Sequence, residues 1–296
     1  MVNYYQSAKN KPQIFNQLNC KELLFVHYNC PLEFGKTINW SEQNFILYII
    51  SGKKGLHTPG QSWILTRSDA AFVKKGAAII DKYFTEEVLC IITFFIPDNY
   101  LRSFIHDHKN LTRQKVLSTS CNDLVIPLQT NDLMSAYIES LLPYFYAETK
   151  PSEELLELKF RELLLNILSN PENQQLNNYL HQLTMSRADN LRQTMEANCL
   201  FNLTLENYAR LNNLSLSSFK RHFFSVFHMS PGQWLLRQKL DYAHKLLLTS
   251  DRSISEICFE SGFEDSTNFS HVFKKKFGES PLKFRAKFNP PYSYKI

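Results

Sequence analysis

The sequence of 296 residues lacks any long hydrophobic run, and its longest unbroken apolar stretch, residues 45–50, is six residues long. A helix that spans a bilayer needs about 20 apolar residues, so the sequence predicts no transmembrane segment. Its first residues carry no basic segment that leads into an apolar stretch, so we expect no signal peptide. These absences predict a protein of the cytoplasm with no membrane partner.

Cysteine is also sparse, with six residues that form no Cys-x-x-Cys pair and have no histidine at zinc spacing. Free thiols explain this pattern best, and we expect no disulfide, metal or cofactor. The sequence has no nucleophile elbow, P-loop or Gly-x-Gly-x-x-Gly motif. Its one His-x-His, at 106–108, falls in a polar stretch that we expect to be a surface loop. An enzyme is therefore not predicted, and no catalytic residue is assigned.

The length and composition predict two domains with real hydrophobic cores, because apolar residues make up 44% of the chain. The charge is unevenly distributed between them. Residues 201–296 hold 14 Lys and Arg against 8 Asp and Glu, whereas the other 200 residues hold 19 against 20. A basic segment beside a neutral one indicates one module that meets a polyanion and another with a different task. The alternative is that the basic residues only solvate a helical domain.

The first 125 residues or so are typical of a β-sandwich or barrel. Short runs of β-branched and aromatic residues alternate with turn signals such as Thr58-Pro59-Gly60. The expected strands cover residues 23–29, 45–50, 62–66, 71–76 and 88–96. Their bulky aromatic residues favour a filled interior, and the alternative is a cavity that binds a small molecule.

From about residue 128 the pattern becomes helical. Leu133, Tyr137, Leu141 and Leu142 have the spacing of one helix face, which predicts a first helix. A second helix at 152–168 has an apolar stripe so wide that it predicts either packing against the β-domain or a homodimer contact. The polar stretch at 170–178 is then typical of a linker.

An internal repeat is the strongest signal in the sequence. At an offset of 50, Phe219, Phe223 and Phe227 match Phe269, Phe273 and Phe277, and a Ser-Pro pair follows in both copies. Each copy predicts a helix-turn-helix, with second helices at 216–227 and 266–277. The segment 231–250 predicts a helix that joins the two copies as a rigid rod.

Residues 262–285, with Gly-Phe, a polar turn, Phe, Phe-Lys and Ser-Pro before an aromatic residue, resemble the signature of the AraC/XylS family of bacterial transcription regulators. Residues 46–76 are loosely similar to the cupin-like barrel of many members. The resemblance implies an α+β protein with three parts. These are a regulatory and dimerisation domain at 1–172, a linker at 173–185, and a DNA-binding domain at 186–296 whose two motifs enter successive major grooves.

Residues on the faces opposite the Phe stripes are predicted to contact bases, and the resemblance places the family's main base contacts on Ser217, Lys220 and Arg221. The predicted base-contacting residues are Ser217, Ser218, Lys220, Arg221, Ser266, Thr267, Asn268, Ser270 and His271. Arg221 suits guanine and Asn268 suits adenine, whereas His271 stands where the family often has Arg. The predicted phosphate contacts are Lys274, Lys275, Lys276 and Lys283, and the alternative for each is a solvated surface lysine.

The partners that follow are promoter DNA and RNA polymerase, with a homodimer through residues 152–168. By resemblance the chain is an activator, although residues alone do not separate activation from repression. The effector is left open between a small molecule in the barrel and a partner protein. The alternative function is therefore a sensing module whose DNA binding is switched by a ligand.

Overall fold

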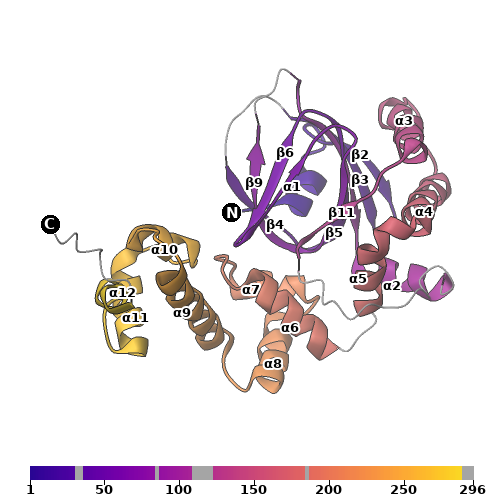
Figure 1. The fold of residues 1–296 in the computed structure, drawn as a ribbon. Coiled ribbons are helices and arrows are strands. Elements are labelled where there is room, and N and C mark those ends of the chain that lie inside the picture. The colour runs from indigo at the N-terminus through magenta and orange to yellow at the C-terminus, as the bar shows by residue number, and fades with distance from the viewer. Residues whose placement is uncertain (31–35, 84–86, 109–122, 184–186, 289–296) are drawn as a thin grey trace. The chain divides into compact units, whose positions relative to one another are not determined.

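The structure is a computed structural model that describes residues 1–30, 36–83, 87–108, 123–183 and 187–288. The chain divides into two compact units, Met1–Ala197 and Asn198–Ile296. The first unit contains two β-sheets and several helices, and the second unit is helical (Figure 1). The α+β class is thus confirmed. No helix within the described residues is long and apolar enough to cross a membrane.

Two sheets form the first unit within the described residues. The first sheet has the order β1 (Val2–Asn3), β4 (Thr37–Ser41), β9 (Gly76–Lys82), β6 (Lys54–Thr58), β7 (Gln61–Leu65). The second has the order β11 (Val125–Leu128), β8 (Ala70–Val73), β5 (Asn44–Ser51), β10 (Cys90–Ile96), β3 (Leu23–Asn29), β2 (Asn16–Cys20). Neighbouring strands pair antiparallel, apart from the parallel pair β1–β4.

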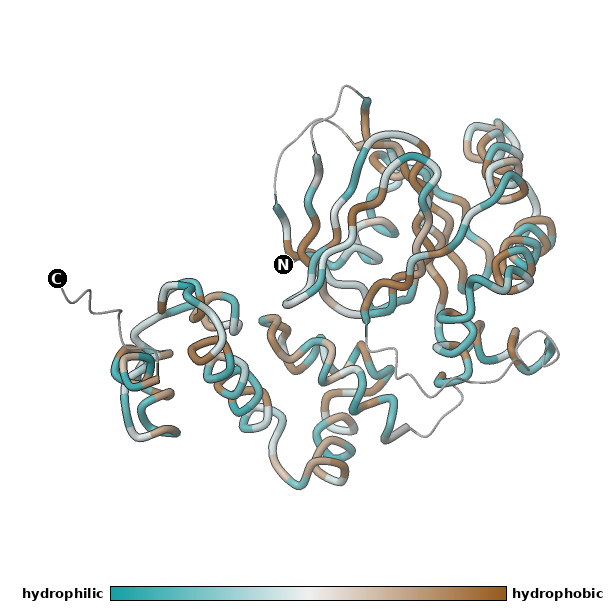
Figure 2. The backbone as a smooth tube through the Cα atoms, viewed as in Figure 1, coloured by the Kyte–Doolittle hydropathy of each residue, from teal (hydrophilic) through white to brown (hydrophobic). Residues whose placement is uncertain are grey.

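The second sheet has a hydrophobic core on each face, which explains why its central strands β5 and β10 are nearly continuous apolar runs (Figure 2). Successive side chains of a strand point to opposite faces. On β5, Phe45, Leu47 and Ile49 join the core that also contains residues of the first sheet, whereas Ile46 and Tyr48 join the core beneath the helices. Both cores therefore depend on the same strand.

Helices cover the outer face of the second sheet. They are α2 (Asp98–Asp107), α3 (Asp132–Tyr146), α4 (Glu153–Ser169), the 3-10 helix η1 (Pro171–Asn173) and α5 (Gln174–Gln182). On α4, the predicted stripe that includes Leu156 and Phe160 is buried in this core, so the expected packing against the β-domain is confirmed. Leu158 of the same helix is 64% exposed.

Two expectations in this region are wrong. Leu133 does not share the buried face of α3, because the buried residues follow the spacing of Met134, Tyr137 and Leu141, and Leu133 lies about 100° round the helix from Met134. The His-x-His at 106–108 lies at the C-terminal end of α2 and not in a loop. There the Nδ1 atom of His108 donates to the carbonyl oxygen of Phe104 at 2.9 Å.

The helix α1 (Tyr4–Asn10) packs against the core that the two sheets share, the one that contains Phe45 of β5. The Tyr4 ring packs against Phe15, Phe45 and Phe95, with ring centroids 6.4, 5.5 and 5.1 Å away. Its hydroxyl group lies 2.9 Å from that of Thr93. Burial raises the pKa of Tyr4 to about 12. This packing favours the filled interior over an open ligand cavity.

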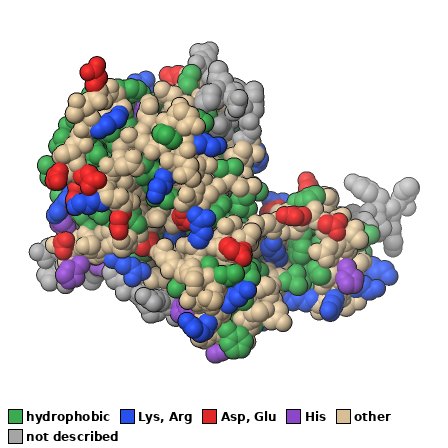
Figure 3. Space-filling model, turned by 180° about the vertical axis from the view of Figure 1, so that it is seen from behind, with side chains coloured by type: hydrophobic (Ala, Val, Ile, Leu, Met, Phe, Trp, Pro, Cys, Tyr) green, Lys and Arg blue, Asp and Glu red, His purple; other side chains and the backbone are tan. Residues whose placement is uncertain are grey.

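The second unit contains the two predicted helix-turn-helix motifs. They are the pair α7 (Leu205–Leu211) and α8 (Leu216–Phe227) and the pair α10 (Ile254–Glu260) and α11 (Ser266–Phe277), with α9 (Pro231–Thr249) between them and α12 (Pro281–Phe288) after them. Phe219 and Phe223 are fully buried, as are their repeat partners Phe269 and Phe273. The repeat is therefore structural. Figure 3 shows Lys and Arg side chains exposed over this part of the chain.

Within the linker that the sequence predicts over 173–185, the structure has the helix α5, and residues 184 and 185 lie outside the described residues. Its Leu176, Tyr179 and Leu180 have the i, i+3, i+4 spacing of a helix face and are buried in the core beneath the helices. The polar Asn and Gln residues around them hid this spacing. The helix α6 (Arg187–Asn198) follows, and the division between the two units falls at 197/198.

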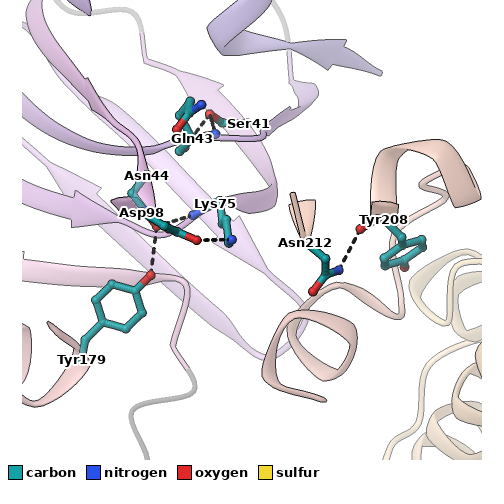
Figure 4. A network of polar contacts seen from close by, with 8 residues as sticks. All are labelled: Ser41, Gln43, Asn44, Lys75, Asp98, Tyr179, Tyr208 and Asn212. Carbon is teal, nitrogen blue, oxygen red and sulfur yellow. Dashed lines mark hydrogen bonds and ion pairs between the residues drawn. The ribbon is translucent and has the colours of Figure 1, made fainter. Parts of the chain in front are cut away.

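A buried polar network fastens α5 to the second sheet (Figure 4). The Oδ1 atom of Asn44 accepts from the Tyr179 hydroxyl at 3.0 Å and from the Lys75 backbone N–H at 3.1 Å. Its Nδ2 atom donates to Asp98 at 2.7 Å, and the Lys75 ammonium group lies 2.5 Å from the same carboxylate. Because each member is paired, the network fixes α5 and the start of α2 on one strand end.

Candidate nucleic-acid interface

Helix caps and a left-handed residue shape the first motif. Thr204 caps α7 by accepting from the backbone N–H of Asn207. Asn213, with φ of 54°, then turns the chain, and Ser215 caps α8 by accepting from the Ser218 N–H. The Tyr208 hydroxyl donates to the buried carbonyl of residue 198 at 2.8 Å, which holds α7 against the start of the unit. These contacts set the direction of α8.

The second motif uses the same devices. Ser253 and Glu256 form a capping box at the start of α10. Gly262, with φ of 80°, ends the turn, and the Asp265 carboxylate accepts from the backbone N–H groups of residues 267 and 268. A Cβ atom at Gly262 would lie 2.3 Å from the carbonyl oxygen of Leu200, so a side chain has no room there.

The helix α9 joins the two motifs. It spans 19 residues and is therefore about 28 Å long. The Lys239 ammonium group on this helix donates to the Asn202 side chain at 2.5 Å and to the Gly262 carbonyl at 2.8 Å. Burial lowers the pKa of Lys239. The rod thus contacts both the segment before α7 and the turn of the second motif.

The outer face of α8 carries the residues predicted for the first recognition helix. Lys220 and Arg221 are exposed. Lys220 also interacts electrostatically with Glu206 of α7. Ser217 is exposed and its hydroxyl lies 3.2 Å from that of the capping residue Ser215. Ser218 is half-buried, and its hydroxyl accepts from the Ser215 hydroxyl at 3.0 Å. The hydroxyl of Ser218 is therefore already engaged at the helix cap.

The outer face of α11 carries the residues predicted for the second recognition helix. Ser266, Thr267 and Asn268 are exposed in its first turn, and His271 is exposed one turn later. Ser270 is half-buried. Because the backbone N–H groups of the first turn are capped by Asp265, the side chains of Thr267 and Asn268 stay available to a ligand.

The lysine cluster is not uniform. Lys274 and Lys275 are exposed at the end of α11, and Lys283 is exposed on α12. The ammonium group of Lys276 lies 2.5 Å from the Asp241 carboxylate on α9, so its charge is already paired. Lys276 thus differs from the other three lysines in its surroundings, and the prediction that all four contact phosphates stays a prediction.

One exposed aromatic residue was missed by the sequence reasoning. Phe224 lies on the outer face of α8 and is 59% exposed. At the repeat offset of 50 its counterpart is Lys274, so comparison of the two copies could have singled it out.

No group of His, Cys, Asp or Glu among the described residues has the arrangement of a metal site.

Two paired helix-turn-helix motifs with exposed cationic recognition helices, joined by one rigid helix and attached to a β-rich unit, define a DNA-binding transcription regulator of two domains. Residues 208–287 match the helix-turn-helix domain family, and residues 44–179 match the family described as the ExsA N-terminal regulatory domain. The chain belongs to the AraC/XylS family of transcription regulators.

The curated relatives are transcription regulators too. The thermoregulatory protein LcrF of Yersinia pestis is 25% identical over 243 residues, which cover 82% of this chain and 89% of LcrF. The HTH-type transcriptional regulator ExsA of Pseudomonas aeruginosa is 25% identical over 268 residues, which cover 90% of this chain and 94% of ExsA. Among solved structures, ToxT from Vibrio cholerae matches with 15% identity and a TM-score of 0.42, over 90% of this chain and 99% of ToxT.

Proposed function

We propose that the chain activates transcription from promoter DNA by placing α8 and α11 in two successive major grooves. The observation that carries this proposal is that two equivalent outward faces, each opposite a buried Phe pair, lie on the two helices that α9 joins. Relatives such as the virulence regulon transcriptional activator VirF of Yersinia enterocolitica support activation. Activation at promoters implies contact with RNA polymerase and a place of action in the cytoplasm.

The proposed base contacts divide between the two helices. Arg221 makes a bidentate contact with guanine O6 and N7, because its guanidinium group is exposed on the outer face of α8. Asn268 reads adenine. The other predicted residues add base contacts at the edges of the two outer faces. They are Ser217, Ser218, Lys220, Ser266, Thr267, Ser270 and His271. Lys274, Lys275 and Lys283 contact phosphates, whereas Lys276 contributes least because Asp241 holds it.

Selection of bound duplexes from a random DNA pool by the full chain tests this function. We expect a recovered site with two half-elements whose centres lie about 10 bp apart, one helical turn of DNA. A site with a single half-element would contradict the use of both motifs. A pool from which no sequence is enriched would contradict specific DNA binding as a whole.

The first unit is proposed to regulate DNA binding. Its two sheets are proposed to close around a common core and so to form a cupin-like barrel. Support comes from the core that Leu56 and Ile80 of the first sheet share with Leu47 of the second.

Homodimerisation is proposed through the outer side of α4, where Leu158 is exposed. Leu158→Glu should then convert a dimer into a monomer in sedimentation velocity, whereas a monomeric wild type would contradict this role.

The effector is proposed to be a partner protein, because α1 and its tyrosines fill the interior beside the strands. A small-molecule effector is the second candidate, and one feature favours it. A cavity of about 310 Å³ lies between α2 and α4, lined by Tyr100, Phe104 and Arg161 among others. A metabolite screen by thermal shift tests it, since a ligand raises the apparent stability in proportion to ln(1 + [L]/Kd).

A further inference from the structure

Phe224 continues the predicted base-contacting stripe of α8. Ser217, Arg221 and Phe224 stand at i, i+4 and i+7, which places them on one face of the helix, and all three are exposed. Phe219 and Phe223 occupy the opposite, buried face. The side chain of Phe224 therefore lies where DNA contacts are proposed, and the core of the unit does not account for it.

The second motif lacks this aromatic group. The repeat pairs Phe224 with Lys274, while the buried Phe pair is the same in both copies. Packing within a helix-turn-helix thus does not require Phe at this position. The presence of Phe in only one copy therefore indicates a role for Phe224 in contact with the surface that α8 binds.

The chemistry of that surface can be inferred from the neighbours of Phe224. Lys220 and Arg221 on the same face suit a polyanion, and both are exposed. Within the major groove of DNA, the apolar group that a side chain meets is the C5-methyl group of thymine. Phe224 follows Ser217 by about 10.5 Å along the helix, which is less than the width of that groove.

We infer that Phe224 reads a thymine through its C5-methyl group, next to the base that Arg221 contacts. This inference rests on the proposed function, since it needs α8 in a major groove. Phe224 then adds specificity to the first motif, whereas Lys274 at the equivalent place adds only affinity for phosphate.

Replacement of single thymines by deoxyuridine in the selected duplex tests the inference, because deoxyuridine keeps the base-pairing edge and lacks only the methyl group. Full-length wild type should lose affinity about fourfold at one thymine of the first half-element, the effect of one methyl group withdrawn from apolar contact. Phe224→Ala should bind the thymine duplex about fourfold more weakly and should not distinguish thymine from uracil at that position.

Two further variants make the result specific. Phe224→Leu keeps an apolar side chain and should restore part of the thymine preference. Phe259→Ala removes an equally exposed Phe, 60% exposed on the supporting helix α10, and should leave the uracil response unchanged. Because Phe224 is exposed, its replacement should not unfold the unit.

The failures of the two proposals are distinguishable. If wild type binds the selected duplex but no thymine responds to uracil, or if Phe224→Ala retains the response, the inference about Phe224 is overturned and the proposed function stands. If wild type enriches no duplex at all, both are overturned.

Discussion

The two helix-turn-helix motifs have left-handed backbone conformations at equivalent positions but carry different residues there. Left-handed conformations occur at Asn213 and His228 in the first motif, with φ of 54° and 53°. The equivalent positions of the second motif hold Gly262 and Gly278, with φ of 80° and 87°. The fold thus dictates the conformation, and local space decides whether a side chain is tolerated.

The outer faces differ in where their charge lies. On α8 the exposed cations, Lys220 and Arg221, lie in the first half of the helix, where base contacts are usual. On α11 the exposed Lys274 and Lys275 lie in the last turn, and the first half carries no Lys, Arg, Asp or Glu. This difference suggests that the first motif contributes more to sequence reading and the second more to anchoring on phosphates.

Gly262→Ala should have the largest effect, because it adds a Cβ atom that meets the Leu200 backbone and strains a left-handed residue. We expect a loss of about 3 kcal/mol or more in the stability of the second motif. Hydrogen exchange of peptides from α10 and α11 in the full chain measures this loss motif by motif.

Gly278→Ala is the matched control for that substitution. Its φ is similar, but nothing lies within 4 Å of the added Cβ atom, so it should lose only about 1 kcal/mol from backbone strain. Equal losses for the two variants would show that contact with Leu200 is not what requires glycine in the turn.

The helical half of the protein was largely predictable because its signals are local. The buried Phe spacing, the Ser253 capping box and the turn at Gly262 each span one turn or loop, and the observed helices α8 and α11 match the expected ranges. The outward faces followed from the same spacing. The pairing of Lys276 with Asp241 could not be predicted in this way, because Asp241 belongs to another helix.

The β-rich half was less predictable because its strands depend on distant partners. The five expected strands are present, but β1, β2, β4, β6, β9 and β11 were not predicted. Strand β9 pairs with β4 through Ala77 and Ala78, residues with low strand propensity that are buried by their neighbours. Strand β11 contains Pro127, which is tolerated because β11 is an edge strand.

Arg221→Ala should have the next largest effect and would sharpen the contrast between the reading faces. Loss of a bidentate contact with guanine costs about 1–3 kcal/mol, so specific binding should weaken roughly 5- to 150-fold while nonspecific binding stays nearly constant. Titration of selected and scrambled duplexes gives both affinities.

His271→Ala, at the equivalent position of α11, is the control for Arg221→Ala. It should weaken specific binding less, because imidazole offers fewer donors than guanidinium. A ratio of specific to nonspecific affinity that Arg221→Ala leaves unchanged would remove Arg221 from base reading. A larger loss for His271→Ala would reverse the assignment of reading and anchoring.

The salt dependence of binding tests the anchoring role of α11. Each phosphate contact contributes about 0.9 to the slope of log K against log salt, so Lys274→Ala and Lys275→Ala should each flatten the slope by about that amount. Lys276→Ala should change it less, because Asp241 already pairs with this lysine. Equal changes for all three variants would show that the ion pair opens when DNA binds.

His228→Gly should have the smallest effect and should make the first motif resemble the second. His228 ends α8 in a left-handed conformation, as Gly278 ends α11, and its backbone N–H donates to the Phe224 carbonyl at 2.9 Å. Relief of the strain is partly offset by the greater freedom of glycine in the unfolded chain, so we expect a gain below about 1 kcal/mol. His228→Ala removes the imidazole and keeps the strain, so it should give no such gain. Hydrogen exchange of α8 peptides compares the two variants, and a gain shared by both would assign the cost to the imidazole ring and not to the backbone.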